Sequence, residues 1–417
     1  MNFMKIDIGT VKGFQDYLPP ESLKRKKIVG IVEKYYRLYG FMPIETPIVE
    51  FDELMKPDVL SEEEDEAIAD RFRLQDKGGR NLGLRYEFTF QLARILKENP
   101  NIKLPFRRYQ IGPVFRDEPI RTGRTRQFVQ CDADIIGDAT VNADAECLAL
   151  VSDILSELKI NNFEIQINNR KLLNSIIESV EIKDVKNVMR ELDKTEKLGV
   201  DLVKANLRKY TSANQIITLF KLMEKDITFF KDNAFDGAEE LEELIKKCKL
   251  YGIKIRFNPS LIRGFAYYTG NIFEVTLPEK KTSLAGGGRY DKTVGKFVNR
   301  EIPAIGISFS LEALIGLCSE SIDKIKLEPV PEIIIISFNK YAEAVKLARK
   351  LRKNETSCII NEGQPSKALD FANSMNIPFV IFVGDAEIEQ EKYKLKDMKS
   401  GEEKLLTEKQ LFAKFSK

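Results

Sequence analysis

Residues 109–137 read "YQIGPVFRDEPIRTGRTRQFVQCDADIIG", and this stretch decides the fold. Two apolar segments, "YQIGPVF" and "QFVQCDADIIG", flank a polar loop with Gly123 where the chain can turn, so the stretch predicts a hairpin of two strands. The loop carries Arg116, Arg121, Arg124 and Arg126. Because the planar guanidinium matches phosphate and carboxylate groups, the hairpin indicates a phosphorylated substrate. The alternative is a solvated hairpin tip whose arginines pair with Asp117 and Glu118.

A second polar stretch, "RGFAYYTG" at residues 263–270, has the composition of a strand. Strict alternation would place Arg263 and Tyr267 on one face and Tyr268 on the other, whereas a bulge near Gly264 would let all three converge. "AGGGRYD" follows at 285–291, and its glycines would let a ligand approach the backbone. The alternative for these glycines is a tight turn between strands.

The segments around these motifs predict a sheet interrupted by helices. "ESLKRKKIVGIVEKYYRLY" at 21–39 has the apolar spacing of an amphipathic helix, and the prolines of "FMPIETPIVE" at 41–50 favour an edge or interface strand. "FEIQI" at 163–167 and "IKIRF" at 253–257 alternate as strands, while the charge-rich region between them has a helical pattern. We therefore expect an inserted helical module at about 170–250.

Beyond residue 330 the pattern changes to alternating strands and helices. "PEIIIISF", "SCIINEG" and "PFVIFVGD" are apolar strand-like runs, separated by the helical "KYAEAVKLARKLRK" and "SKALDFANSM". Such alternation predicts βαβ units and a buried, largely parallel sheet. A separate domain is expected to begin here.

Length and composition bound the class of protein. The 417 residues exceed one ordinary core and indicate two or three domains, and 43% hydrophobic with 31% charged residues is typical of a globular chain. No apolar run approaches the roughly 20 residues that cross a bilayer, and the N-terminus lacks a secretory signal pattern, so we expect a cytoplasmic protein without membrane contact. The net charge of +2 means that a polyanionic partner would be met by local basic patches.

The chain contains no histidine, which restricts its chemistry. Its five cysteines lie far apart without a CxxC spacing, so no zinc site is expected and the thiols should be reduced. Without histidine as a general base, catalysis must use carboxylates, arginines, tyrosines or the substrate itself.

Taken in order, these motifs resemble the class II aminoacyl-tRNA synthetases, and within that class the histidyl-tRNA synthetases. "GFMPIETPIVE" is similar to the first class motif, with Pro47 as its proline; "VFRDE" with the hairpin is similar to the second; "IPAIGISFSLEAL" occupies the place of the third. "RGFAYYTG" and "AGGGRYD" resemble two signatures of the histidyl enzymes. The resemblance implies an α/β protein: an α+β catalytic domain with a mainly antiparallel sheet at 1–168 and 252–325, a helical insertion at 169–251, and a C-terminal α/β anticodon-binding domain with a mostly parallel sheet at 330–417.

The resemblance also implies an activity: ATP-dependent ligation of L-histidine to histidine tRNA through a histidyl-adenylate, by a homodimer, with Mg²⁺ accompanying ATP. The implied catalytic and ATP-binding residues are Arg116, Arg263 and Glu118. The implied histidine-binding residues are Glu87, Thr89, Gln130, Asp134, Tyr267 and Tyr268, with Asp134 and Tyr268 on the imidazole. No base need deprotonate the nucleophile, because a carboxylate is already ionised at neutral pH. No protein side chains are expected to form a metal site by themselves.

For tRNA, the implied contacts are Arg121 and Arg124 at the acceptor end and lysines of the C-terminal domain, such as Lys346 or Lys367, at the anticodon stem. Phosphate contacts of this kind position a nucleic acid without reading its sequence.

The chain departs from the family pattern at two places. The third motif ends in Ala313 where the class has an arginine that reaches ATP, so Arg289 or Arg300 would have to substitute or ATP would bind more weakly; Ala266 stands where the family often has a carboxylate. A noncatalytic paralogue, of the kind that regulates ATP phosphoribosyltransferase, is therefore the alternative, although such paralogues typically lack an anticodon-binding domain. A glycyl or threonyl enzyme fits less well, because the tyrosine signature is present and zinc ligands are missing.

Overall fold

The hairpin at 109–137 forms the centre of the fold. In the computed structural model, which describes residues 8–55, 71–120, 125–263, 267–278, 280–325, 327 and 331–415, β5 (Phe106–Phe115) pairs with β6 (Gln127–Ile136) in antiparallel register. The predicted hairpin strands are thus confirmed. Both strands are ten residues long and half or fully buried, as their apolar composition requires.

Around this hairpin lies an eight-stranded sheet with the order β1-β5-β6-β11-β10-β9-β7-β8. Only the outer pairs β1–β5 and β7–β8 are parallel, so the mainly antiparallel sheet is confirmed. The added strands are β1 (Met42–Pro43), β7 (Glu164–Asn169), β8 (Ile255–Phe257), β9 (Asn271–Leu277), β10 (Lys280–Arg289) and β11 (Ala304–Ser310). A small second sheet contains β2 (Val49–Phe51), β3 (Arg73–Gln75) and β4 (Asn81–Leu84).

One face of the large sheet is covered by helices. The helix expected near the N-terminus is α1 (Glu21–Leu38), and it buries Ile28 and Val32 against the core. It packs on α5 (Val141–Glu157), which in turn contacts α12 (Ala238–Leu250) and the strands β6, β10 and β11. Helix α13 (Leu311–Leu317) contacts α1, and α14 (Ser319–Ile322) follows it; the cavity described below opens on the other face, where α4 (Thr89–Glu98) begins.

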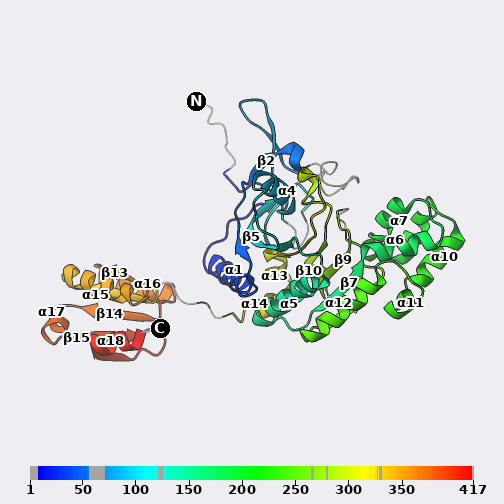
Figure 1. Cartoon of the computed structure of the whole chain (residues 1–417). Coiled ribbons are helices and arrows are strands. Elements are labelled where there is room, and N and C mark those ends of the chain that lie inside the picture. The colour runs from blue at the N-terminus through cyan, green and yellow to red at the C-terminus, as the bar shows by residue number, and fades with distance from the viewer. Residues whose placement is uncertain are drawn as a thin grey trace. The chain divides into compact units, whose positions relative to one another are not determined.

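Between β7 and β8 the chain is helical, and the two strands pair side by side although 85 residues separate the end of β7 from the start of β8. These helices gather at one end of the unit formed by residues 1–325 (Figure 1). They are α6 (Arg170–Ser179), α7 (Val185–Leu192), α8 (Thr195–Leu198), α9 (Val200–Leu207), α10 (Ala213–Leu222) and α11 (Ile227–Asp232), followed by α12. A side-chain cap begins several of them, as at Asn169, Asp184 and Ser212.

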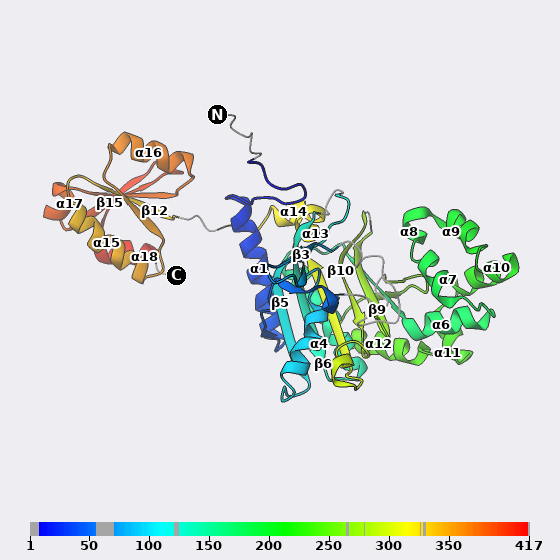
Figure 2. The ribbon, with the colours of Figure 1, turned by 90° about the horizontal axis from the view of Figure 1, so that it is seen from above.

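Residues 326–417 form a second compact unit with its own five-stranded sheet, ordered β13-β12-β14-β15-β16. The strands β12 (Ile333–Ser337), β13 (Cys358–Asn361) and β14 (Phe379–Val383) are parallel, as expected, while β15 (Lys392–Asp397) and β16 (Glu403–Thr407) add an antiparallel hairpin. Figure 2 shows α16 (Pro365–Ser374) on one face and α15 (Tyr341–Lys353) and α18 (Glu408–Phe415) on the other; α17 (Asp385–Glu389) follows β14.

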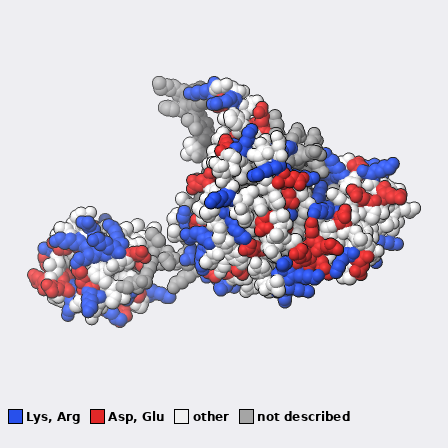
Figure 3. All heavy atoms as spheres, in the orientation of Figure 1, with Lys and Arg blue, Asp and Glu red and all other residues white. Residues whose placement is uncertain are grey.

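Two global expectations can be compared with the structure. All five cysteines are free and buried, as expected for structural thiols. On the face seen in Figure 3, Lys and Arg are interspersed with Asp and Glu, in line with the small net charge. None of the helices in the described residues is both long and apolar enough to cross a membrane.

Candidate active site

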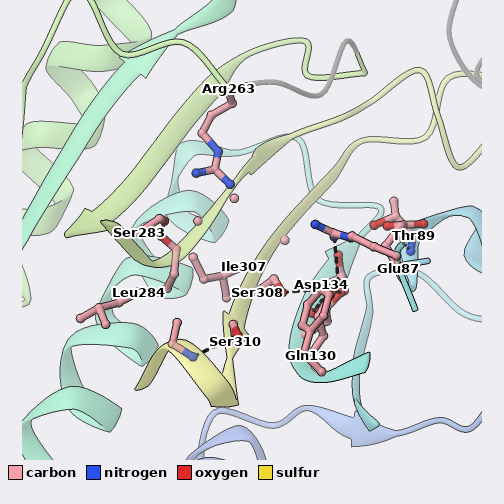
Figure 4. A pocket seen from close by; sticks show the side chains of 18 of the residues that line it. Glu87, Thr89, Gln130, Asp134, Arg263, Ser283, Leu284, Ile307, Ser308 and Ser310 are labelled. Atoms are coloured by element: carbon pink, nitrogen blue, oxygen red, sulfur yellow. Dashed lines mark hydrogen bonds between the residues drawn. The ribbon is translucent and has the colours of Figure 1, made fainter. Parts of the chain in front are cut away.

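A cavity of about 230 Å³ opens on the sheet face that α1 and α5 leave uncovered (Figure 4). Every predicted catalytic or histidine-binding residue lines it: Glu87, Thr89, Arg116, Glu118, Gln130, Asp134, Arg263, Tyr267 and Tyr268. The structure therefore brings together side chains from the segment before α4, both hairpin strands, the "RGFAYYTG" stretch and their neighbours.

The alternation of β6 explains why its polar residues meet here. Cys131, Ala133 and Ile135 point into the core, so Gln130, Asp132 and Asp134 point to the opposite face and line the cavity. On the adjacent β11, Gly306, Ser308 and Ser310 take the equivalent positions. A Cβ on Gly306 would collide with the carboxylate of Asp134, so this glycine makes room for that side chain.

Glu87 lies at the start of α4 and is 4% exposed. Its carboxylate accepts hydrogen bonds of 2.7 Å from the backbone N–H groups of Thr89 and Phe90. Burial raises the pKa of Glu87 to about 7, although these hydrogen bonds oppose the shift. A carboxylate with this pKa in a closed site can accept a cationic ammonium group and ionise fully as it does so.

Gln130 forms hydrogen bonds with cavity residues on both of its sides. Its Nε2 donates to both carboxylate oxygens of Asp132, at 3.1 and 3.2 Å, and to the hydroxyl of Ser308 at 3.2 Å. Its Oε1 accepts from Nη2 of Arg116 at 3.2 Å. The amide is thus held with its oxygen toward the arginine.

Each carboxylate oxygen of Asp134 has one close partner. Nη2 of Arg108 lies 2.6 Å from Oδ2, and the hydroxyl of Tyr290 donates to Oδ1. Burial raises the pKa of Asp134 to about 6, although Arg108 opposes this. Arg108, Asp132 and Tyr290 were not among the residues predicted from the sequence. A signal was present, because charged residues alternating within a buried strand, as in "RYQ" opposite "DAD", indicate a polar face.

The two tyrosines lie side by side, with ring centroids 4.9 Å apart, and Tyr267 packs edge-on against Tyr290 at 5.7 Å. Tyr268 is 7% exposed, and its burial raises its pKa, so the hydroxyl stays protonated and can donate. The expected strand through this stretch is wrong for its described part. Strand β9 begins only at Asn271, and without a pleat the two tyrosines are free to line the same cavity. The bulge expected near Gly264 lies outside the described residues.

Arg263 lies across the cavity from Glu87 and Thr89 (Figure 4). Its Nη1 pairs with Oε1 of Glu274 on β9 at 2.7 Å, and 19% of its side chain is exposed. Its guanidinium rests against Gly286, where any Cβ would overlap it, so this glycine of the "AGGGRYD" motif is needed for the close approach.

Arg116 follows directly after β5 and is held between two aromatic rings, 5.0 Å from the centroid of Tyr86 and 4.9 Å from that of Phe128. Nη1 lies 3.9 Å from Oε1 of Glu118, and the side chains are 22% and 24% exposed. The aromatic sandwich fixes the cation while leaving hydrogen-bonding capacity toward the cavity.

The proposed substitutes for the third-motif arginine are not at the site. Arg289 forms a buried ion pair with Asp144 and donates to the carbonyl oxygens of Asp138 and Thr140, so it anchors β10 to α5. Arg300 is exposed and does not line the cavity, whereas Ala313 does. The suggestion that Arg289 supplies the missing cation is wrong, because a carboxylate 145 positions away already holds it.

The other predicted residues either do not line the cavity or lie outside the described residues. Arg121, Arg124 and Ala266 lie outside the described residues. Lys346 on α15 and Lys367 on α16 are exposed on the second unit. Within the described residues, no three His, Cys, Asp or Glu side chains form a cluster suited to a metal ion.

Comparison with known proteins supports the family that the sequence motifs resemble. A family model for "Histidyl-tRNA synthetase" matches residues 13–314, and one for "Anticodon binding domain" matches residues 332–417. Histidine-tRNA ligase 1 of Bacillus cereus is 37% identical over 419 residues and covers 95% of each chain.

Two solved structures are also similar. The crystal structure of histidyl-tRNA synthetase from Nostoc sp. covers 99% of both chains with a TM-score of 0.85 and 28% identity. A Bacillus halodurans chain described as "ATP phosphoribosyltransferase regulatory subunit/histidyl-tRNA synthetase" has a TM-score of 0.74 over 89% of this chain. At 23% identity, that second likeness shows a common fold alone. On the match over both units and the full-length relative, the chain belongs to the histidyl-tRNA synthetase family.

Proposed function

We propose that this chain is an active histidine-tRNA ligase that joins L-histidine to its tRNA through a histidyl-adenylate. The observation that carries the proposal is that one cavity contains both arginines suited to a phosphate and the buried acceptors and donors suited to histidine. A family relationship alone would leave the chemistry to inference. Here the side chains that the chemistry needs converge on one space.

At one end of the cavity, we assign the α-amino group to Glu87, with Thr89 and Gln130 nearby. The imidazole has one N–H donor and one nitrogen acceptor, and discrimination requires partners for both. Asp134 can only accept when ionised, and Tyr268 can donate. A ligand without these two nitrogens would leave buried polar groups unpaired, so strong selection for histidine is expected without an editing site.

In the first reaction step, a carboxylate oxygen of histidine attacks the α-phosphorus of ATP, and the bond from that phosphorus to the pyrophosphate oxygen breaks. Arg116 and Arg263 would stabilise the negative charge that develops on the α-phosphate. In the second step, a ribose hydroxyl at the tRNA terminus attacks the carbonyl carbon, loses its proton and displaces AMP.

Glu118 fits a role with Mg²⁺, because its partly exposed carboxylate lies at the cavity 3.9 Å from Arg116. With no metal cluster among the described side chains, the ion would arrive bound to the phosphates of ATP. There it would neutralise phosphate charge.

The second unit supports a contact with the anticodon stem, and we assign this role to residues 332–417. The exposed lysines Lys346 and Lys367 are candidates for phosphate contacts, and Arg121 and Arg124 stay predictions for the acceptor end. Exposed apolar side chains at Met42, Ile48, Val49 and Phe51 support a homodimer through this segment. The cytoplasmic location also stays a prediction.

One observation favours a regulatory paralogue instead: Ala313 removes a cation from the nucleotide end. The anticodon-binding unit and the complete histidine-binding set favour the ligase. Pyrophosphate exchange measured with each amino acid in turn tests the proposal. Exchange that requires both histidine and ATP is the expected result, whereas histidine binding without exchange would indicate a regulator.

A further inference from the structure

Arg108 is the largest side chain with no exposed surface in the described residues. It lies on β5 directly opposite Asp134 on β6, with Nη2 2.6 Å from Oδ2. It does not line the cavity, so no substrate atom is expected to touch it. It lies beside the carboxylate that we assign to the imidazole, on the same face of the sheet.

Burying a guanidinium in the core of a protein is unfavourable, because the cation loses its hydration. In the described residues, none of the three guanidinium nitrogens of Arg108 has a hydrogen-bond partner; Nη2 forms an ion pair with Oδ2 of Asp134 without hydrogen-bond geometry. Replacing such a pair with apolar residues of similar volume is often neutral or stabilising. Packing therefore gives little reason for an arginine here, and a role in the adjacent site gives one.

The adjacent site needs a cation, because three buried carboxylates share it. Glu87, Asp132 and Asp134 are 4%, 5% and 4% exposed, and all three line the cavity. Each disfavours the ionisation of its neighbours. Arg108 interacts electrostatically with all three and makes direct contact with Asp134.

The contacts of Asp134 restrict the orientation of its carboxylate as well as affecting its charge state. Arg108 forms an ion pair with one carboxylate oxygen, the Tyr290 hydroxyl donates to the other, and Gly306 leaves the space in which the group sits. A carboxylate with a close partner at each oxygen has a restricted orientation, and Oδ2, which accepts no hydrogen bond from the described residues, can still accept one from a ligand. An imidazole N–H is a donor that such an acceptor can select.

We propose that Arg108 is a positioning residue that keeps the Asp134 carboxylate ionised and directed at the imidazole of bound histidine. This inference rests on the proposed function, since it assumes that histidine occupies the cavity. It adds a residue outside the cavity wall to those that determine amino-acid specificity.

Charged and titratable groups from several elements surround the Arg108–Asp134 pair. Arg108 on β5, Asp132 on β6, Tyr290 after β10, Tyr36 on α1 and Cys147 on α5 interact electrostatically with Asp134, and Glu87 before α4 interacts with Arg108. Burial raises the pKa of Tyr36, Tyr290 and Cys147 well above their usual values, so these groups stay neutral in the physiological range. Glu87 and Asp132 are the neighbours that can change charge there.

The test compares two replacements in the full-length protein. Arg108→Met removes the charge and keeps an unbranched apolar stem, and Arg108→Lys keeps the charge. Histidine affinity is measured by calorimetry from pH 6 to pH 9, together with ATP affinity and melting temperature. For Arg108→Met we expect roughly tenfold weaker histidine binding at pH 7, because the pKa of Asp134 rises, and recovery toward pH 9. Arg108→Lys should keep the pH profile of the parent protein, and neither change should alter ATP affinity.

Arg94→Gln is the matched control, because Arg94 also forms a partly buried ion pair, with Glu50 at 2.8 Å, but lies outside the cavity wall. It should leave the histidine profile unchanged. If Arg108→Met does not fold, Arg108→Gln provides the neutral variant. Histidine affinity that falls equally at every pH, or does not fall, would overturn the inference and leave Arg108 as a packing residue. Absence of histidine binding by the unmodified protein would instead overturn the proposed function, and this inference with it.

Discussion

The two ends of the cavity differ in how far their side chains are preorganised before a ligand binds. At the amino-acid end, the side chain of Asp134 is 5% exposed, and it is paired with Arg108 at one oxygen and hydrogen-bonded to Tyr290 at the other. At the nucleotide end, Arg116 and Glu118 are 22% and 24% exposed, their closest approach is 3.9 Å, and Ala313 occupies a position where the class has an arginine.

This difference matches what each ligand brings. Histidine is small and must be distinguished from other amino acids, so its buried partners need fixed positions before binding. ATP brings four negative charges and its own metal ion, so a few arginines at a wetter surface suffice to hold it. We therefore expect the specificity for histidine to depend on the buried end of the cavity and the rate of the reaction with ATP to depend on the open end.

The largest expected effect is at Arg263, between the two ends. Arg263→Ala should lower histidine-dependent pyrophosphate exchange by about a hundredfold or more, since losing one preorganised donor to transition-state charge costs roughly 2.7–4 kcal/mol. Arg256→Ala is the control, because Arg256 also pairs with a glutamate, at 3.1 Å, but is 63% exposed on β8. Circular dichroism should show both variants folded. Exchange within about threefold of the parent would remove Arg263 from the mechanism.

Tyr268→Phe probes the buried end. The ring stays and one hydroxyl is lost, which would leave an imidazole nitrogen unpaired, so histidine affinity should fall by about 1–3 kcal/mol, or roughly 5- to 150-fold. Calorimetry should show ATP affinity unchanged. Tyr251→Phe, at a residue that is 51% exposed, controls for the loss of a hydroxyl. A lower melting temperature with intact histidine affinity would make Tyr268 a core aromatic instead.

The same contrast separates what the sequence could predict from what it could not. The β5–β6 hairpin was predictable because its two apolar runs are close together in the sequence. The convergence of Glu87, Asp134 and Tyr268 came only from resemblance to a family, since nothing local ties these three positions together. Arg289 was misjudged for the related reason that Asp144, its partner, is remote in sequence. Arg108 was overlooked because a charge inside a strand shows its partner only when the register is known.

Histidine binding should depend on pH through Glu87. Its pKa of about 7 means that it is mostly protonated at pH 6 and mostly ionised at pH 8. Because only the ionised form pairs with the ammonium, affinity should rise about tenfold from pH 6 to pH 8 from this group alone. Imidazole-propionate, which lacks the amino group, is the reference ligand. Its pH profile contains the contributions of Asp134 and of the imidazole, so these cancel when the two profiles are compared. Calorimetry should therefore show a steeper profile for histidine than for this analogue, and Glu87→Gln should remove the difference; equal slopes would contradict the assignment.

The smallest effect concerns the open end, where an arginine can be returned. Ala313 lines the cavity at the start of α13, so Ala313→Arg would project a cation toward the proposed ATP phosphates. One added charge contact at a partly wet surface is worth about 1 kcal/mol, so the KM for ATP should fall by about fivefold while histidine affinity stays constant. Ala313→Met adds similar bulk without charge and should not lower the KM. If both variants raise the KM alike, position 313 lacks room for a long side chain. If Ala313→Arg leaves the KM for ATP unchanged while Ala313→Met is tolerated, the nucleotide end already has enough positive charge to bind ATP. The two ends of the cavity would then differ in exposure and not in charge.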